Sequence, residues 1–219
     1  MLLAAITCNK DNSETANLIN SFLVSTGKKI SITDSKSLME MSPSHIKEYI
    51  QQLSRNNFEY LIIKINPYYI NKTLLDYIHF DIMILTEKAD DLKRINYENY
   101  FYAIRSFFSL MDDKGTIIMN VDDNEALKFL KGFKHHIITY GFNSKASVTT
   151  SSVGNMGSED SFMCCLQRTV STKSGVVVEP QEYRIKLESN EFDSYNILAA
   201  AAFAIVNDID LNNAGILEN

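Results

Sequence analysis

The chain has 219 residues, of which 45% are hydrophobic and 22% are charged. This composition is typical of a packed soluble domain and too apolar for a disordered chain. The formal net charge of −6 argues against nucleic acid as a partner, because nucleic-acid binders usually present a basic surface. No apolar run approaches the roughly 18 residues of a membrane span, and the first residues lack the basic segment of a signal peptide.

The cysteines and glycines of the chain indicate its redox environment and limit the kinds of loop that it can form. Cys8, Cys164 and Cys165 form no CxxC pair, which predicts a reducing, cytoplasmic location with neither a disulfide framework nor a zinc site. There are 8 glycines and none before Gly27, whereas average usage of about 7% would give about 15.

Residues 1–142 alternate between two periodicities. Short, nearly continuous apolar runs are typical of buried parallel strands. They predict strands at Leu2–Ile6, Ile30–Ile32, Tyr60–Ile65, Asp81–Thr86, Thr116–Asn120 and His136–Tyr140. Apolar stripes at helical spacing lie between them, at Leu18–Leu23, Ile46–Leu53, Tyr100–Phe108 and Leu127–Leu130. The alternation predicts a doubly wound, mostly parallel α/β sheet.

The pattern changes after residue 142. Segment 143–160 is rich in Ser, Thr, Gly and Asn, which predicts a loop with room for one strand. Antiparallel strands are expected at Phe162–Gln167, Val176–Glu179 and Tyr183–Glu188, with Gly175 at a hairpin turn. A closing helix follows, and its alanines predict close packing. We therefore expect one domain with a parallel part (1–142), a small antiparallel appendage (143–190) and a closing helix (191–219).

Ligands of open α/β sheets bind at the carboxyl ends of the strands, so segment 7–15, after the first predicted strand, is the first candidate site. A phosphate-binding loop there needs glycines, a lysine and a following hydroxyl. The segment reads Thr-Cys-Asn-Lys-Asp-Asn-Ser-Glu-Thr and resembles the T-G-T-N-G-K-[ST]-[ST]-[ST] loop of the Mur ligases, the ATP-dependent amide-forming enzymes of peptidoglycan precursor synthesis. Thr7, Ser13 and Thr15 match, but Cys8 and Asp11 occupy the glycine positions, Asn12 the lysine position, and Glu14 a hydroxyl position.

Four later segments carry the same resemblance in order along the chain. Residues 115–123 resemble G-x-x-x-x-N-x-D-D, residues 138–141 resemble T-Y/F-G, residues 100–108 resemble Y-x-x-A-K-x-x-L-F, and residues 192–200 resemble F-N-x-x-N-x-L-A-A. The second Asn of the last motif, Asn196 here, lies near the adenine in family members. The resemblance implies the central, ATP-binding domain of a Mur ligase, which is P-loop NTPase-like.

The same resemblance implies that several functional groups are replaced. The Glu of E-x-S-S, which helps to hold magnesium in the family, corresponds to Lys64, and the carbamylated lysine corresponds to Ile104. The T-N-x-x-x-D-H-x-D segment matches only partly, at residues 86–91. The flanking domains that bind the UDP-linked substrate and the incoming amino acid are expected to be missing.

The loop residues favour loss of nucleotide binding on physical grounds. Asp11 and Glu14 have the spacing of an N-cap and capping box, so the helix would satisfy its own N-terminus. Each carboxylate placed about 4 Å from a phosphate charge costs about 4 kcal/mol at an effective dielectric of ~20. At the end of the fifth predicted strand, Asp122 or Asn120 is expected to cap the next helix.

These observations favour a stand-alone homologue of the Mur ligase central domain without ligase activity by itself. It would bind or scaffold a cell-wall enzyme or form a homo-oligomer, with no cofactor, catalytic residue or metal ligand. One alternative is a divergent ATP-dependent acid–amino acid ligase, or a nucleotide-binding subunit completed by another chain, with ATP and Mg as cofactors. A second is a generic small-ligand domain that uses Asp90 or Asp91. The expected nucleotide-binding remnants are Thr7, Ser13, Thr15, Asp123 and Asn196.

Overall fold

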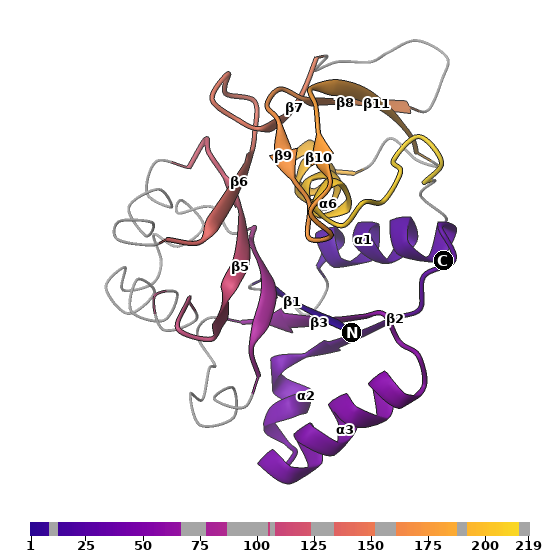
Figure 1. The fold of residues 1–219 in the computed structure, drawn as a ribbon, viewed down its shortest axis with the longest axis vertical. Helices are drawn as coiled ribbons and strands as arrows, with labels where there is room; N and C mark the ends of the chain where they lie inside the picture. Colours follow the sequence, from indigo (N-terminus) through magenta and orange to yellow (C-terminus); the bar gives the residue numbers. More distant parts are fainter. Residues whose placement is uncertain are drawn as a thin grey trace. The chain divides into compact units, whose positions relative to one another are not determined.

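The computed structural model describes residues 1–8, 13–66, 78–86, 105, 108–123, 134–151, 161–187 and 192–214 (Figure 1). The chain divides into two compact units. Unit 1 comprises Met1–Ser13, Lys29–Ile117 and Asp123–Ile137, and unit 2 comprises Glu14–Lys28, Ile118–Asp122 and Ile138–Asn219.

Unit 1 is built on parallel strands that hydrogen-bond in the order β4-β1-β3-β2. Their bounds are β1 (Leu2–Thr7), β2 (Ile30–Asp34), β3 (Tyr60–Ile65) and β4 (Phe80–Leu85). The three inner strands are almost wholly buried, whereas β2 is half-buried along its whole length. Near-continuous apolar sequences predicted these strands because both faces of such a sheet are covered.

Two helices follow β2 in unit 1, and Figure 1 shows them side by side. The short α2 (Ser35–Met39) starts at the N-cap Asp34, whose carboxylate accepts a hydrogen bond from the Ser37 N–H. The longer α3 (Pro43–Arg55) starts after Ser42, with Pro43 at its first turn, where a missing N–H costs nothing. Ile46 and Leu53 are the buried residues of α3, so its predicted apolar stripe is confirmed.

The next two strands have parts in both units. The strand β5 (Met111–Asn120) begins earlier than the predicted Thr116, and Asp112, Asp113 and Lys114 are exposed on this extension. The strand β6 (His136–Tyr140) has the predicted bounds. The polar extension of β5 carried no apolar signal, which is why periodicity missed it.

Unit 2 contains most of the antiparallel pairing. The strand β7 (Val148–Thr150) lies parallel to β6 and antiparallel to β8 (Ser161–Leu166), which pairs with β11 (Gln181–Lys186). A separate two-stranded antiparallel sheet joins β9 (Val170–Ser171) to β10 (Val177–Val178) through the turn at Gly175. The small antiparallel sheet was predicted, but β9 was not, because two residues carry no periodicity.

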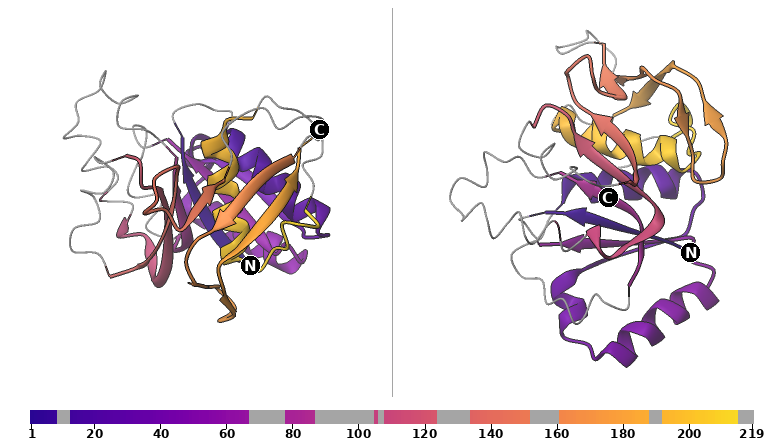
Figure 2. Two further views of the ribbon diagram at one scale, coloured as in Figure 1. Left: turned by 90° about the horizontal axis from the view of Figure 1, so that it is seen from above. Right: turned by 60° about the vertical axis from the view of Figure 1, so that its left-hand side comes forward.

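Two helices complete unit 2: α1 (Glu14–Ser25) and α6 (Ser194–Val206). They pack against each other, and both views in Figure 2 show them side by side. Every residue from Ile197 to Val206 is buried. The alanine run in α6 permits this close approach because its side chains are small, so the predicted close packing of the closing helix is confirmed.

Two predicted helices fall outside the described residues. In the Tyr100–Phe108 stripe, only Arg105 and Phe108 are described; Arg105 is exposed and Phe108 is buried. The Leu127–Leu130 stripe is not among the described residues. The α/β class with a mostly parallel sheet is confirmed by the strands above.

Candidate functional site

The carboxyl ends of β1, β3 and β4 are level in unit 1, since Thr7 is in register with Ile65 on one side and Leu85 on the other. Thr7 is 1% exposed. Its hydroxyl donates to the Ile84 carbonyl at 3.4 Å and accepts from the Thr86 N–H at 3.3 Å. The Thr86 hydroxyl donates in return to the Thr7 carbonyl. Thr7 therefore links two neighbouring strand ends.

A positive side chain lies near the end of β3. Lys64 is half-buried and is in register with Asp34 of β2. The N–H of Ser37 lowers the pKa of the Asp34 carboxyl, and the positive charge of Lys64 lowers it further. The Asn66 N–H donates to the Ser35 hydroxyl at 3.4 Å. An ammonium group donates hydrogen bonds and cannot ligate a cation, so Lys64 does not fit a magnesium site.

The N-terminal ends of α1 and α6 are tied together in unit 2. Thr15 is buried, with only 1% of its surface exposed. Its hydroxyl donates to Oδ1 of Asn196 at 2.8 Å. One residue earlier, Glu14 Oε1 accepts from the Asp193 N–H at 2.7 Å. The first contact joins Thr15 and Asn196, both of which match motif positions. The second places the Glu14 carboxylate beside them.

The N-terminus of α6 is capped by its own chain. Asp193 is the N-cap, and its Oδ1 accepts from the Tyr195 N–H at 2.7 Å. The N–H groups of Asn196 and Ile197 donate to the Asp193 carbonyl. An anion usually binds a helix start through N–H groups of this kind. In α6, these N–H groups already donate to the carboxylate and the carbonyl of Asp193.

Asp122 accepts hydrogen bonds from two other segments of unit 2. Its Oδ1 accepts from the Asn143 N–H at 2.9 Å, and its Oδ2 accepts from the Phe142 N–H at 2.6 Å and the Tyr195 hydroxyl at 3.2 Å. The rings of Phe142 and Tyr195 meet edge to face at a centroid distance of 4.7 Å. Asp122 thus fixes the loop after β6 to the start of α6.

Gly141 makes this arrangement of Asp122 possible. Its φ is +148°, and a Cβ placed there would lie 2.6 Å from Asp122 Oδ2 and 3.1 Å from Asn120 Oδ1. The amide oxygen of Asn120 in turn accepts from the Asp122 N–H at 2.9 Å. The three matched motif positions Asn120, Asp122 and Gly141 therefore form one packed cluster.

Burial first, and then the negative charge of Asp122, raise the pKa of Tyr195 above its ordinary value of 10.0. The phenol is the donor in its hydrogen bond to the carboxylate. Losing its proton would place two negative oxygens together. The structure therefore favours a protonated Tyr195.

The predicted site residues are distributed between the two units. Thr7 and Ser13 belong to unit 1, and both are buried. Thr15 and Asn196 belong to unit 2 and are hydrogen-bonded to each other. Asp123 is half-buried in unit 1. The positions of Lys10, Asp11, Asn12, Asp90, Asp91 and Ile104 lie outside the described residues.

Sequence reasoning missed three polar side chains of these clusters. Asp122 or Asn120 was expected to cap the next helix, whose residues 124–133 lie outside the described residues; the contacts of Asp122 with Phe142, Asn143 and Tyr195 were not foreseen. The hydrogen bond of the Tyr195 hydroxyl to Asp122 was not foreseen either. Asp11, the expected capping-box partner of Glu14, lies outside the described residues, and the contact of Glu14 Oε1 with the Asp193 N–H was not foreseen. The motif matches at residues 115–123 and 192–200 pointed to these segments but not to their partners.

No group of three or more His, Cys, Asp or Glu side chains in the described ranges is arranged to hold a metal ion. Within the same parts of the chain, no helix combines the length and apolar character needed to cross a bilayer.

The strands and helices define an α/β protein with a mostly parallel sheet. A family model described as "Mur ligase middle domain" matches residues 13–204. Because this match covers most of the chain, the protein belongs to the Mur ligase middle-domain family. The resemblance inferred from the loop and the four later motifs is thereby confirmed.

Similar proteins support this assignment. The chain is 22% identical over 163 residues to UDP-N-acetylmuramoyl-L-alanyl-D-glutamate–2,6-diaminopimelate ligase of Chlamydia pneumoniae, covering 73% of this chain and 31% of that protein. MurF of Acinetobacter baumannii has a similar structure, with a TM-score of 0.67, 14% identity and coverage of 97% of this chain and 44% of MurF. MurF ligase of Thermotoga maritima, solved in complex with ADP, gives a TM-score of 0.61 at 11% identity, covering all of this chain and 48% of that ligase.

The chain spans about a third of the length of the curated relative and less than half of these solved structures. At these identities the structural likeness establishes the fold alone.

Proposed function

We propose that this Mur ligase middle domain does not form amide bonds by itself and acts by binding, as a scaffold for a cell-wall enzyme or for a second copy of itself. The observation that carries the proposal is the hydrogen bond from Thr15 to Asn196. Both residues match positions that the resemblance assigns to nucleotide contacts. In this chain they satisfy each other.

The charges in unit 2 support the same conclusion. Glu14 and Asp193 place two carboxylates at the paired helix starts, linked by the hydrogen bond from the Asp193 N–H to Glu14. A triphosphate brought to these ends would meet the carboxylates of Glu14 and Asp193. Each such contact at about 4 Å costs about 4 kcal/mol at an effective dielectric of ~20.

One described position also argues against Mg-ATP as a ligand. Lys64 stands where the resemblance places a magnesium-holding glutamate, and an ammonium cannot donate a lone pair to a metal. The loop sequence supports the proposal as well, because Asn12 replaces the matched lysine and Asp11 a matched glycine.

Titration calorimetry with Mg-ATP and Mg-ADP tests the proposal directly, with thermal shift as a second measurement. We expect no binding heat and no rise in Tm, because a ligand raises the stability of a protein only if the native state binds it. MurF ligase of Thermotoga maritima, whose structure contains ADP, is the positive control. Micromolar binding of Mg-ATP would overturn the proposal and support the alternative of a divergent ligase or nucleotide-binding subunit.

A variant of the same chain shows whether the loop residues exclude the nucleotide. Cys8→Gly and Asp11→Gly combined with Asn12→Lys and Glu14→Ser restore the two glycines, the lysine and the hydroxyl of the matched loop. If the loop is the barrier, this variant gains binding of nucleotide that the parent chain lacks. A parent chain that already binds as tightly as the variant would contradict the proposal.

A further inference from the structure

The strand β2 ends the parallel sheet of unit 1, and its outer edge is chemically unusual. Residues Ile30, Ser31, Ile32 and Thr33 are all half-buried. They contain no Pro and no charged residue, and three of the four are β-branched, which favours strand pairing. Proteins usually protect such edges with charges, prolines, bulges or a covering segment, because an open edge recruits another strand.

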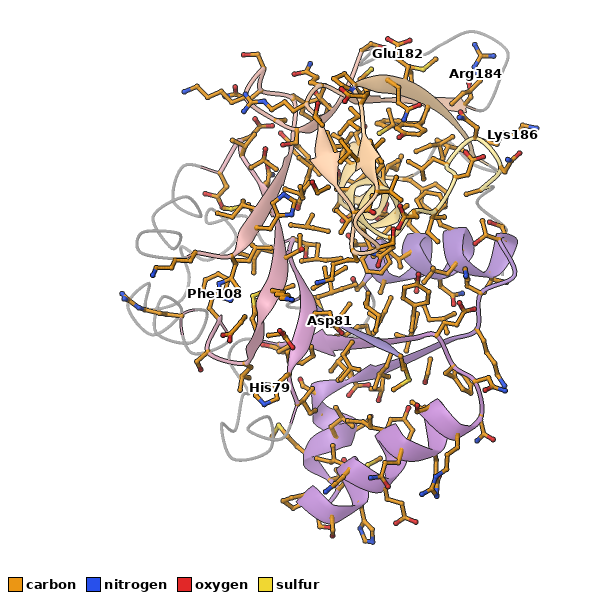
Figure 3. The ribbon with its side chains drawn as sticks, in the orientation of Figure 1. His79, Asp81, Phe108, Glu182, Arg184 and Lys186 are labelled. Atoms are coloured by element: carbon orange, nitrogen blue, oxygen red, sulfur yellow. The ribbon has the colours of Figure 1, made fainter. Side chains whose placement is uncertain are left out.

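The strand β11 in unit 2 is also the last strand of its sheet, and charged side chains protect its edge. Glu182, Arg184 and Lys186 are exposed on β11, and Figure 3 shows their side chains projecting outward. The Arg184 N–H is also occupied, since it donates to Oδ1 of Asn212 at 3.1 Å. The strand β11 therefore carries three charges, and a side chain binds one of its N–H groups, whereas within the described parts of the chain Ile30–Thr33 of β2 has neither device.

Backbone geometry shows which groups β2 offers at its edge. The Lys29 carbonyl accepts from the Glu59 and Tyr60 N–H groups, so Lys29 faces β3. Because backbone groups alternate in direction along a strand, Ser31 and Thr33 also face β3. Ile30 and Ile32 then direct their backbone groups to the outer edge. The Ser31 side chain contacts the Tyr49 hydroxyl of α3 at 3.1 Å, so the side chains of Ile30 and Ile32 lie on the opposite face.

These edge groups are complementary to themselves under a two-fold rotation. An antiparallel copy centred on Ile32 places Ile32 opposite Ile32 and Ile30 opposite Asp34. Lys29 precedes the strand and Asp34 ends it, so this pairing brings the basic end of each strand beside the acidic end of the other. Within one chain, the exposed Lys29 ammonium donates to the Asn56 carbonyl at 2.9 Å, and the Asp34 carboxylate accepts from the Ser37 N–H at 2.8 Å. The Asp34 carboxyl is ionised at neutral pH, since its pKa lies below even the ordinary value of 3.8.

We propose that β2 is a homodimerisation edge, at which two copies of this chain pair antiparallel about Ile32 and join their sheets. This edge is then the surface through which the chain acts as a scaffold for a second copy of itself. The dimer does not depend on whether the chain binds nucleotide. A five-residue edge buries less than the roughly 1,200–2,000 Å² of a standard stable interface. The dimer is therefore weak and depends on concentration.

Sedimentation velocity on the full chain, from about 10 μM to about 1 mM, tests this surface over the range expected for a weak interface. We expect the weight-average sedimentation coefficient to rise from the monomer value toward the dimer value. Ile32→Pro removes an outward N–H without breaking the β2–β3 ladder and should abolish the rise. A wild-type chain that stays monomeric up to about 1 mM, or a dimer that Ile32→Pro leaves intact, overturns the proposal.

Opposite charges introduced at Ile32, on the two-fold axis, provide a second test, because unfolded variants could not recover dimers when they are mixed. Ile32→Lys and Ile32→Glu each place like charges opposite each other, so each variant alone should be monomeric. An equimolar mixture should recover dimers, because Lys then faces Glu. Lys186→Glu on β11 is the matched control and should leave wild-type dimerisation unchanged. Variants that fold, as judged by circular dichroism, and yet fail to recover dimers when mixed would contradict pairing about Ile32.

Discussion

Thr15 and Asn196 are 181 residues apart in the sequence, and the Thr15 hydroxyl donates a hydrogen bond to Oδ1 of Asn196 at 2.8 Å. The bond links the first turns of α1 and α6, whose packing forms the helical part of unit 2. A contact between two such distant positions depends on the whole unit folding. It is therefore a direct measure of native packing.

Thr15→Val removes this donor while keeping the shape of the side chain. We expect the free energy of unfolding to fall by about 1–2 kcal/mol, because Asn196 loses its partner at a part-buried position. Urea titration of Thr15→Val, Asn196→Ala and the double variant measures the interaction as a coupling energy. Thr15→Ser keeps the hydroxyl and serves as the control. Additive single effects would show that the hydrogen bond contributes nothing.

Gly141→Ala should be among the most damaging glycine substitutions in unit 2. The new Cβ would lie 2.6 Å from Asp122 Oδ2 at a backbone φ of +148°. The carboxylate would have to move away from the Phe142 and Asn143 N–H groups. We expect a loss of more than about 2 kcal/mol in unfolding free energy.

Gly27→Ala is the matched control for that substitution. Gly27 also has a positive φ, of +76°, but no atom lies within 4 Å of a Cβ built there. Only the backbone strain of about 1 kcal/mol applies. Equal losses for the two variants, measured by urea titration, would show that Asp122 does not constrain Gly141.

The raised pKa of Tyr195 makes stability fall in alkaline solution. The folded state favours the protonated phenol more than the unfolded chain does. Its contribution is therefore complete below the unfolded pKa of about 10 and is lost as pH rises through the higher folded value. Urea midpoints from pH 8 to 11 should decrease less steeply for Tyr195→Phe than for the wild type. Parallel pH profiles for the two proteins would rule out this role of Tyr195.

Asp34 should have the opposite pH dependence. Hydrogen bonding from the Ser37 N–H lowers the pKa of its carboxyl, so its contribution is present above the unfolded pKa of about 3.9 and is lost as pH falls through the folded value. Asp34→Ser keeps an N-cap oxygen for α2 but cannot titrate. Between pH 5 and pH 2 we expect a shallower decrease in urea midpoint for Asp34→Ser than for the wild type. An unchanged slope would show that Asp34 titrates alike in both states.

Local sequence patterns predicted most of the strands. The strands β3 and β6 have the predicted bounds. In β3 the apolar run is continuous because both faces of the strand are covered. The helix α2 was missed because only Ser35 and Leu38 are buried among its five residues, which is too few to show a periodicity. The polar start of β5 was missed for the same reason.

The sequence by itself determined the alternation of strands and helices, and the motif matches that identified the family. Tertiary structure alone decided which polar groups meet. It paired Thr15 with Asn196, and it directed the Asp122 carboxylate to Phe142, Asn143 and Tyr195. Hydrophobic periodicity depends on neighbours within one helix or strand, so a single chain can reveal it. A hydrogen bond between distant residues depends on how folded elements pack, and no spacing in the sequence records that arrangement.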